Sequence, residues 1–499
     1  MSIINLLLLS KDLVFTPSIL LTSFLGTLAG VTIGALPGLT ATMGVAIIIP
    51  FTFGMSFQHA FALLLGTYCG GVFGGSMTAV IANIPGTPSA MMTRLDGYPM
   101  GQRGEGGKAI FYATIASFIG GIISVAILII FAPPIAKIAL RFSAQEYFAV
   151  AFFGLSIIAY VSSGSMLKGF ISGFLGLLLA SVGMDAINAY PRYTFGNAEI
   201  MSGFELLPIL IGIFGVSNVF EVIEKEIGTK IKLGKKIQSI LISWKDFLRV
   251  LPIILRQAPI GTIIGAIPAA GGTIAAIVAY GFEKRISSHP EKFGTGIPEG
   301  IVAPETANNA STGGALIPLL TLGIPGDAIG AILIGGLMIH GLAPGPMLFV
   351  DHPEIISSIF LLMIISNVFF FFIAFGMAKI INNILKLPYS VLMPIILVLC
   401  TIGSFAIRTS IFDIFLLLTF GILGYIMGKL DIPRAPLVLG FILGPIMESN
   451  LRRGLLLSGG NIFTFFTRPI SASFLILTII LLLFPLIMSK ARRGKKGEE

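Results

Sequence analysis

Long hydrophobic stretches, separated by short polar segments, fill most of this 499-residue sequence. Between Asp12 and Arg94 the chain has no Asp, Glu, Lys or Arg, although one membrane-spanning helix needs only about 20 residues. Further uncharged stretches of span length lie at 109–136, 147–167, 257–282, 328–350, 355–378 and 469–489. With the shorter windows added, the pattern predicts about ten to twelve membrane passes.

Composition supports the same fold class. The chain is 55% hydrophobic and 11% charged, and its mean hydropathy is +0.97, whereas about a quarter of the residues of a soluble domain are charged. We therefore expect an all-α, polytopic integral membrane protein and exclude a soluble enzyme domain. The N-terminal segment lacks the basic start and cleavage site of a signal peptide, so we expect it to be retained.

Helix-breaking residues recur in the same order in the two halves of the chain. The segment 34–44 has a counterpart at 265–273, and the segment 83–88 has one within 304–327. A helix is interrupted at membrane depth only where the freed backbone groups face protein, water or a ligand, so matched breaks indicate a transport site. Chance repetition among 60 Gly and 28 Pro is the alternative. We expect two pseudo-symmetric repeats of broken or re-entrant helices, with inverted topology.

Basic segments mark the boundaries of these repeats. We expect a first repeat at 1–223, a linker at 224–249, a second repeat at 250–488 and a tail at 489–499. Lys and Arg are concentrated in the linker and the tail, which places both on the cytoplasmic side. Apolar residues of helical spacing around Trp244 predict a helix lying in the membrane interface, or equally a linker helix packed on the protein.

The strongest polar cluster is Pro304 to Gly314. Carboxylate, amide and hydroxyl side chains precede an apolar run, as expected for a cation or substrate site. We predict the coupling-ion site from Glu305, Asn308, Ser311, Thr312 and Asp327. The alternative for the cluster is an N-cap that opens a membrane helix, with Glu305 in its first turn.

Asp327 has several possible roles. It is predicted to bind a cation, carry a proton, or pair with a basic residue such as Arg94 or Arg408; the alternative is a solvated turn residue at the membrane edge.

The breaks expose helix N-termini, which suit an anion such as a carboxylate. The predicted substrate-binding residues are Gly38, Thr40, Thr42, Asn83, Gly86, Thr87, Gly271, Gly272, Thr273, Asn308 and Asn309. For the glycines, close helix packing is an equally good explanation.

Several of these motifs resemble one known family, the large membrane subunit of the tripartite tricarboxylate transporters. The resemblance covers essentially the whole chain and rests on the segments 34–44, 83–86, 95–99, 304–310 and 339–346. It implies import of citrate or another carboxylate across the bacterial inner membrane by Na⁺ or H⁺ symport. It also implies a small membrane subunit and a periplasmic binding protein as partners.

Two positions differ from the family pattern. Ala269 stands where Gly is expected after the proline, which bears on the geometry of that break. Asp327 stands where a neutral residue is commoner, and its charge would repel a tricarboxylate unless compensated by Na⁺, a proton or Arg.

Other functions find little support in the sequence. There is no phosphate-binding loop, the four histidines are scattered, and Cys69 and Cys400 suggest no disulfide framework or metal cluster. We therefore expect no enzymatic activity and no cofactor besides the coupling ion. Neither do the basic loops indicate nucleic-acid binding. A passive channel for small polar solutes is the alternative function. The sequence leaves open the particular carboxylate, the coupling ion, its stoichiometry and the oligomeric state.

Overall fold

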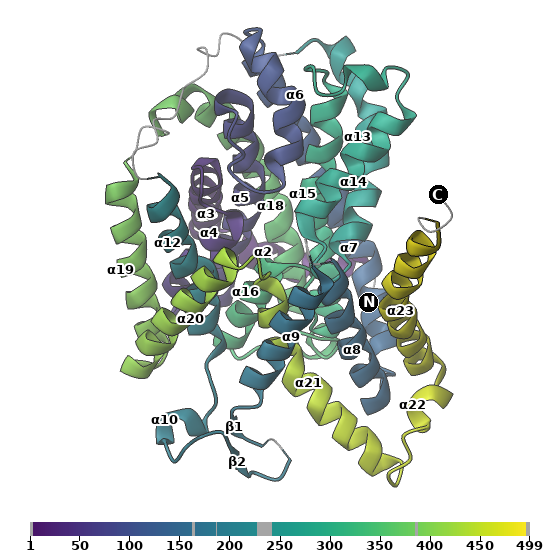
Figure 1. Cartoon of the computed structure of the whole chain (residues 1–499). Coiled ribbons are helices and arrows are strands. Elements are labelled where there is room, and N and C mark those ends of the chain that lie inside the picture. Colours follow the sequence, from purple (N-terminus) through teal and green to yellow (C-terminus); the bar gives the residue numbers. More distant parts are fainter. Residues whose placement is uncertain (1–2, 162–164, 186, 227–241, 385–387, 496–499) are drawn as a thin grey trace. The chain divides into compact units, whose positions relative to one another are not determined.

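A computed structural model describes residues 3–161, 165–185, 187–226, 242–384 and 388–495. Helices form nearly all of the described chain, and one short hairpin provides the described strands (Figure 1). In that hairpin β1 (Gly183–Met184) pairs antiparallel with β2 (Pro191–Arg192), with Gly183 opposite Arg192. The expected all-α class is confirmed. Most of the basic linker lies outside the described residues.

The chain divides into two compact units, and each combines segments far apart in sequence. Unit 1 comprises residues 1–136 and 207–425, and unit 2 comprises residues 137–206 and 426–499. The helices of unit 1 are α1 (Ile3–Leu8), α2 (Lys11–Val14), α3 (Pro17–Ala35), α4 (Ala41–Ile48), η1 (Ile49–Thr52), α5 (Phe57–Ala82), α6 (Ala90–Gln102), α7 (Gly106–Ala139), α11 (Leu206–Leu210), η2 (Ile211–Val216), α12 (Ser217–Glu226), α13 (Trp244–Gly265), α14 (Gly271–Ile286), η3 (Pro290–Lys292), α15 (Glu299–Leu322), α16 (Ala328–Ile339), α17 (Leu348–Asp351), α18 (Pro353–Ile384), α19 (Tyr389–Arg408) and α20 (Ile411–Lys429).

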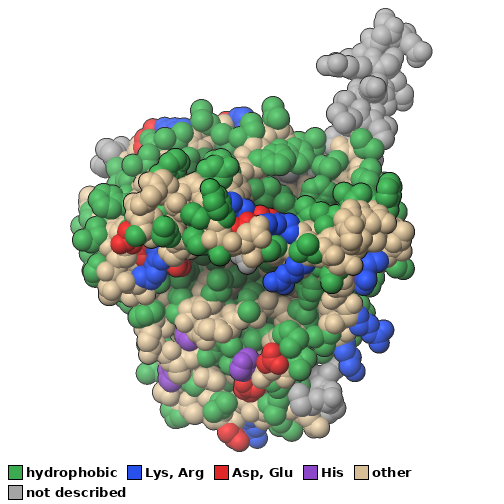
Figure 2. Space-filling view, turned by 90° about the horizontal axis from the view of Figure 1, so that it is seen from below, with side chains coloured by type: hydrophobic (Ala, Val, Ile, Leu, Met, Phe, Trp, Pro, Cys, Tyr) green, Lys and Arg blue, Asp and Glu red, His purple; other side chains and the backbone are tan. Residues whose placement is uncertain are grey.

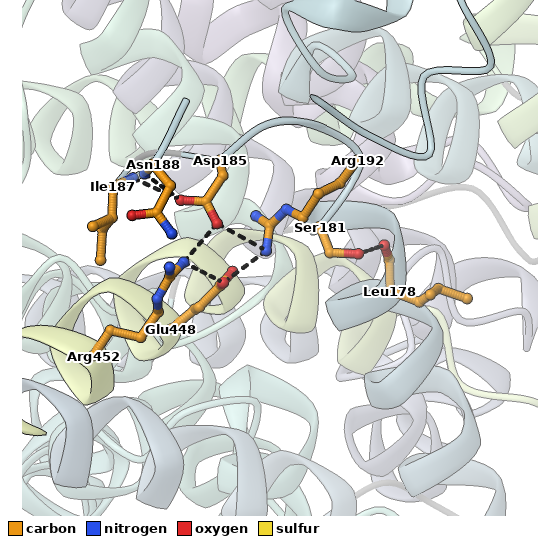
Figure 3. A network of polar contacts seen from close by, with 8 residues as sticks. All are labelled: Leu178, Ser181, Asp185, Ile187, Asn188, Arg192, Glu448 and Arg452. Atoms are coloured by element: carbon orange, nitrogen blue, oxygen red, sulfur yellow. Dashed lines mark hydrogen bonds and ion pairs between the residues drawn. The ribbon is translucent and has the colours of Figure 1, made fainter. Parts of the chain in front are cut away.

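Unit 2 carries the hairpin and a smaller set of helices: α8 (Ala144–Val161), α9 (Met166–Ala180), α10 (Ala198–Met201), α21 (Ala435–Leu457), α22 (Thr464–Thr467) and α23 (Pro469–Lys495). Four charged side chains tie the hairpin to α21 (Figure 3). Asp185 accepts from Arg452 Nη1 at 2.6 Å, and Arg192 Nη1 donates to Glu448 Oε1 at 2.7 Å. The backbone N–H of Asn188, the Arg452 guanidinium and the backbone N–H of Ile187 hold the pKa of Asp185 well below its usual range.

Eight helices in the described part of the chain are long and apolar enough to cross a membrane, and five shorter apolar helices accompany them. Large hydrophobic side chains on these helices are exposed, among them Ile263, Phe372 and Ile411, each 65–66% exposed. Figure 2 shows hydrophobic side chains spread over one face, with charged side chains in small groups. Such a surface suits lipid, because a soluble protein rarely exposes apolar patches of this extent.

Small residues bring pairs of helices into close contact in unit 1. Gly30 and Gly34 of α3 lie against the backbone of Thr67 and Gly71 in α5, where a Cβ atom would overlap carbonyl oxygens. The contact recurs between α13 and α15, where Gly261 and Gly265 lie against the backbone of Ala307 and Ser311. The two glycines of α3 precede their counterparts in α13 by the same number of sequence positions. The two contact residues of α5 likewise precede their counterparts in α15 by a constant number of positions.

Helices α5 and α15 run antiparallel. Ser76, near the end of α5, donates to Glu305, near the start of α15, at 2.6 Å. Asn308, further along α15, donates to the Val72 carbonyl, further back along α5, at 3.4 Å. The two helices that make the same contacts within their own halves therefore point in opposite directions.

Helices α13 and α14 form a hairpin. Arg256 of α13 contacts Glu283 of α14 at 2.5 Å, and Arg249, near the start of α13, pairs with Glu299 at the start of α15. The loop 266–270, which carries the second proline break, is therefore at the far tip of the hairpin. Helix α13 begins at Trp244, whose side chain is 72% exposed, and continues past the expected boundary at residue 250.

One expected break is much shorter than predicted. Residues 304–322 belong to the continuous helix α15, and the interruption begins only at Gly323. The polar residues do not break the helix because their hydroxyls bond to carbonyls within it: Ser311 donates to Asn308 and Thr312 to Asn309, both at 2.7 Å.

Candidate transport site

The first break separates α3 from α4. Gly38 has φ +81°, a left-handed conformation that few residues other than glycine adopt freely. Thr40 caps α4 by accepting from the Met43 N–H at 3.1 Å. Thr42 follows in the first turn; it is half-buried, and its hydroxyl has no hydrogen-bond partner among the described residues.

The second break, between α13 and α14, repeats the left-handed turn but lacks the side-chain cap, and α14 begins at Gly271 with φ +56°. Ala269 adopts φ +62°, so the substitution of alanine for the expected glycine leaves the left-handed turn in place. Its N–H donates to the Gly326 carbonyl at 2.7 Å, which joins this break to the one after α15. Thr273 lies in the first turn of α14, half-buried like Thr42, and is also unpartnered within the described chain.

The downstream breaks match each other as well. Asn83 ends α5 at φ +59°, and Gly323 ends α15 at φ +71°. Gly86 then packs against the Gly34 carbonyl, just as Gly326 packs against the Gly265 carbonyl. Thr87 is buried, and its hydroxyl lies 3.1 Å from that of Ser89. Gly86 and Thr87 thus lie inside the protein, whereas Asn83 is exposed.

The asparagine-rich part of α15 faces the tip of the α13–α14 hairpin. A side chain at Gly272 would overlap Asn308 Oδ1 and crowd Ser311 Oγ at 3.2 Å. Asp327 packs against Gly271 in the same place. The structure therefore brings the predicted residues Gly271, Gly272, Asn308, Ser311 and Asp327 together. The hydroxyls of Ser311 and Thr312 both donate to carbonyls of their own helix, and no contact brings Thr312 to this group.

Asp327 accepts from the Tyr68 hydroxyl at 2.8 Å and from the Gly330 N–H at 2.7 Å, so it caps α16 and links it to α5. The predicted pairing with a basic residue is wrong in both forms. Arg408 pairs with Asp413 at 2.7 Å, and Arg94 makes no ion pair with Asp327. The neutral hydroxyl of Tyr68 is the side-chain partner of Asp327 where a basic residue was expected.

Glu305 occupies a second polar pocket further along α15. Its side chain is fully buried and accepts from three hydroxyls on three other helices: Ser76 of α5, Thr93 of α6 and Ser117 of α7. Asn309 completes the cluster by donating to Ser117 Oγ at 2.7 Å. We call these five residues the Glu305 cradle. Glu305 lies beyond the first turn of α15, which begins at Glu299, so the N-cap alternative is wrong.

Sequence reasoning did not identify Tyr68 or the three hydroxyls of the cradle. No local pattern marks them, because each lies far from its partner in sequence. The sequence analysis also assigned no role to Asp96. This carboxylate is buried and accepts hydrogen bonds from the Tyr280 hydroxyl and from three backbone N–H groups, those of Gly294, Gly296 and Ile297. Its position in the motif 95–99, as a carboxylate among apolar residues, was the available signal.

Among the described residues, no group of three or more His, Cys, Asp or Glu side chains is placed to hold a metal ion. The polar groups at the breaks are helix N-termini, hydroxyls and amides. Such groups bind carboxylates by hydrogen bonds and by the dipole of the helix.

Comparison with known proteins identifies the family. The family model described as "Tripartite tricarboxylate transporter TctA family" matches residues 20–439. The chain is 36% identical over 493 residues to the "Uncharacterized 52.8 kDa protein in TAR-I ttuC' 3'region" of Agrobacterium vitis, with 98% of both chains covered. It is 37% identical over 233 residues to the "Uncharacterized protein in TAR-II ttuC' 3'region" of the same organism, covering 46% of this chain and 96% of the relative. No solved structure matches. The chain belongs to the tripartite tricarboxylate transporter TctA family, whose members are membrane subunits of carboxylate transporters.

Proposed function

We propose that this chain is the substrate-translocating subunit of a secondary active transporter. It takes up citrate or a related di- or tricarboxylate, driven by a Na⁺ or H⁺ gradient. It works in the bacterial inner membrane with a small integral membrane subunit and a periplasmic binding protein that delivers the substrate. The basic linker and tail face the cytoplasm.

One observation carries this proposal: after each proline break a helix begins, and its first turn holds a threonine whose hydroxyl has no hydrogen-bond partner among the described residues. Thr42 at α4 and Thr273 at α14 follow left-handed turns at Gly38 and Ala269. Both side chains are half-buried, and their hydroxyls are free to donate a hydrogen bond to a ligand. A carboxylate accepts such a bond and also benefits from the positive end of the helix dipole.

The repeated contacts support a mechanism of alternating access. Helices α5 and α15 make matching contacts within their halves and run antiparallel, as inverted repeats require. Each half also contacts the other reciprocally, because α16 packs on α4 and α14 packs on α6. In such an arrangement the two halves exchange conformations, and the substrate site opens to each side in turn.

Transport into proteoliposomes tests the proposal. The chain is reconstituted with the small subunit and binding protein of its own system, and uptake of labelled citrate, succinate and malate is followed under an imposed Na⁺ or pH gradient. Saturable uptake that requires a gradient and the binding protein is expected. Uptake that is non-saturable and indifferent to both would favour the passive channel instead.

A further inference from the structure

The Glu305 cradle contains a carboxyl group without a cationic partner. Glu305 has no measurable exposure, and its contacts are the hydroxyls of Ser76, Thr93 and Ser117. A buried, ionised carboxylate is strongly disfavoured unless a positive charge or a full set of donors compensates it. The cradle supplies donors but no positive charge.

The hydrogen bonds of the cradle fit two protonation states of Glu305. Ser117 Oγ accepts from Asn309 Nδ2 at 2.7 Å, so its own hydrogen is directed to Glu305 Oε2 at 3.0 Å. Ser76 and Thr93 both approach Oε1. A hydroxyl can donate or accept by rotating. When Oε1 carries a proton, either hydroxyl can turn to accept it, and no backbone movement is needed.

Charged and titratable groups on the neighbouring helices make no hydrogen bond or ion pair with Glu305, and most of them are engaged with other residues. On α6, Asp96 bonds to backbone N–H groups and to Tyr280 of α14. On α14, Glu283 pairs with Arg256 of α13 and accepts from Gln257. On α5, Tyr68 bonds to Asp327 and Cys69 bonds to Met363. Lys108 lies near Glu105, and Arg249 pairs with Glu299. Three further groups make no hydrogen bond to Glu305: Arg94, Tyr98 and Tyr112.

We propose that the coupling ion is a proton and that Glu305 carries it, an inference that rests on the transport function proposed above. A hydronium ion on the outer side gives a proton to Glu305 Oε1 and leaves as water. The conformational change then exposes the neutral carboxyl to the inner side, where the proton passes to water and forms hydronium. No other bond is made or broken. A metal cation would have to separate oxygens that lie 2.6 and 3.0 Å apart and turn the hydroxyl hydrogens away from Glu305, whereas a proton uses these contacts as they stand.

Three proteoliposome measurements test this proposal with labelled citrate as the probe. The first is accumulation under a pH gradient, acid outside, or under a Na⁺ gradient. The second is acidification of the lumen during uptake, read by an entrapped pH-sensitive dye. The third is exchange of labelled for unlabelled citrate without any gradient, which needs no net movement of protons. Glu305→Gln keeps the size of the side chain, and Glu299→Gln at the start of the same helix is the matched control.

In the wild type and in Glu299→Gln, the pH gradient is expected to drive accumulation and uptake is expected to acidify the lumen. Glu305→Gln should lose both responses and retain exchange, which also shows that it is folded. Accumulation driven by Na⁺ without acidification would overturn the proton proposal and leave the transporter intact. Citrate, succinate and malate uptake that is non-saturable and needs no gradient would overturn the proposed function itself.

A second variant tests the cradle without removing the carboxyl group. Ser76→Ala deprives the ionised form of Glu305 of one donor, so the proton is held more tightly. The pH of half-maximal citrate uptake is therefore expected to move to higher pH, with exchange preserved. An unchanged pH profile would contradict the role given to Glu305.

Discussion

At the scale of single residues, Ala269 shows how a turn is kept when glycine is absent. Its φ of +62° lies in the left-handed region, which costs an alanine about 1–2 kcal/mol. We expect Ala269→Gly to stabilise the protein by roughly 0.5–1 kcal/mol, since glycine loses part of the gain to the greater freedom of the unfolded chain. Thermal unfolding in detergent measures this change in the free energy of unfolding. Ala276→Gly, inside α14, should destabilise instead, and equal effects of the two would refute the explanation.

Thr42 and Thr273 belong to the same scale. Replacing either hydroxyl with Thr→Val keeps the side-chain shape and removes one hydrogen bond to a bound carboxylate. A bond to a charged group contributes about 1.5–3 kcal/mol, so the KM for citrate is expected to rise by at least tenfold. Thr22→Val in α3 is the control, because that hydroxyl bonds to the Ser18 carbonyl of its own helix at 2.9 Å. Wild-type uptake by both site variants would remove these threonines from the site.

At the scale of elements, the sequence predicted where helices stop better than where polar groups meet. Proline and glycine interrupt helices through local geometry, so the breaks near 37, 85, 268 and 325 could be read directly. The expected motif 304–327 was too long, because residues 304–322 lie within the continuous helix α15 and the hydroxyls of Ser311 and Thr312 bond inside it. The Glu305 cradle joins α15 to three consecutive helices of the first half, α5, α6 and α7, about 190–230 residues away in sequence. Such a cluster depends on packing, which has no signature in a single sequence.

The hairpin of unit 2 is an element held by charge. Tyr190, Tyr193 and Phe195 are 70%, 56% and 90% exposed around β2, while Asp185 and Glu448 anchor the loop through Arg452. Arg452→Gln should therefore accelerate chymotrypsin cleavage at the three aromatic residues several-fold at neutral pH. Arg453→Gln is the control, since Arg453 is exposed and makes no ion pair within the described chain.

Acidification should weaken this anchor only at a pH well below the ordinary pKa of an aspartate. Because the pKa of Asp185 is lowered in the folded protein, its contribution to stability is complete above the unfolded value of about 4 and is lost as pH falls through the lower folded value. Hydrogen exchange in the segment 187–192 is thus expected to show the same protection at pH 5 and pH 7, after correction for intrinsic exchange rates. Lost protection at pH 5 would contradict the pairing of Asp185.

At the scale of the whole molecule, the proposed inverted repeat makes a prediction about sides of the membrane. Ser56 precedes α5 and Ser288 precedes α15, and both side chains are exposed. Since α5 and α15 run antiparallel, these residues are expected on opposite sides. In a background with Cys69→Ala and Cys400→Ala, an impermeant maleimide should label Ser56→Cys in intact cells. Ser288→Cys should react only after permeabilisation, because the proposed orientation puts the basic linker, and with it this side, in the cytoplasm. Labelling of both from one side would exclude inverted repeats and would remove their support for alternating access.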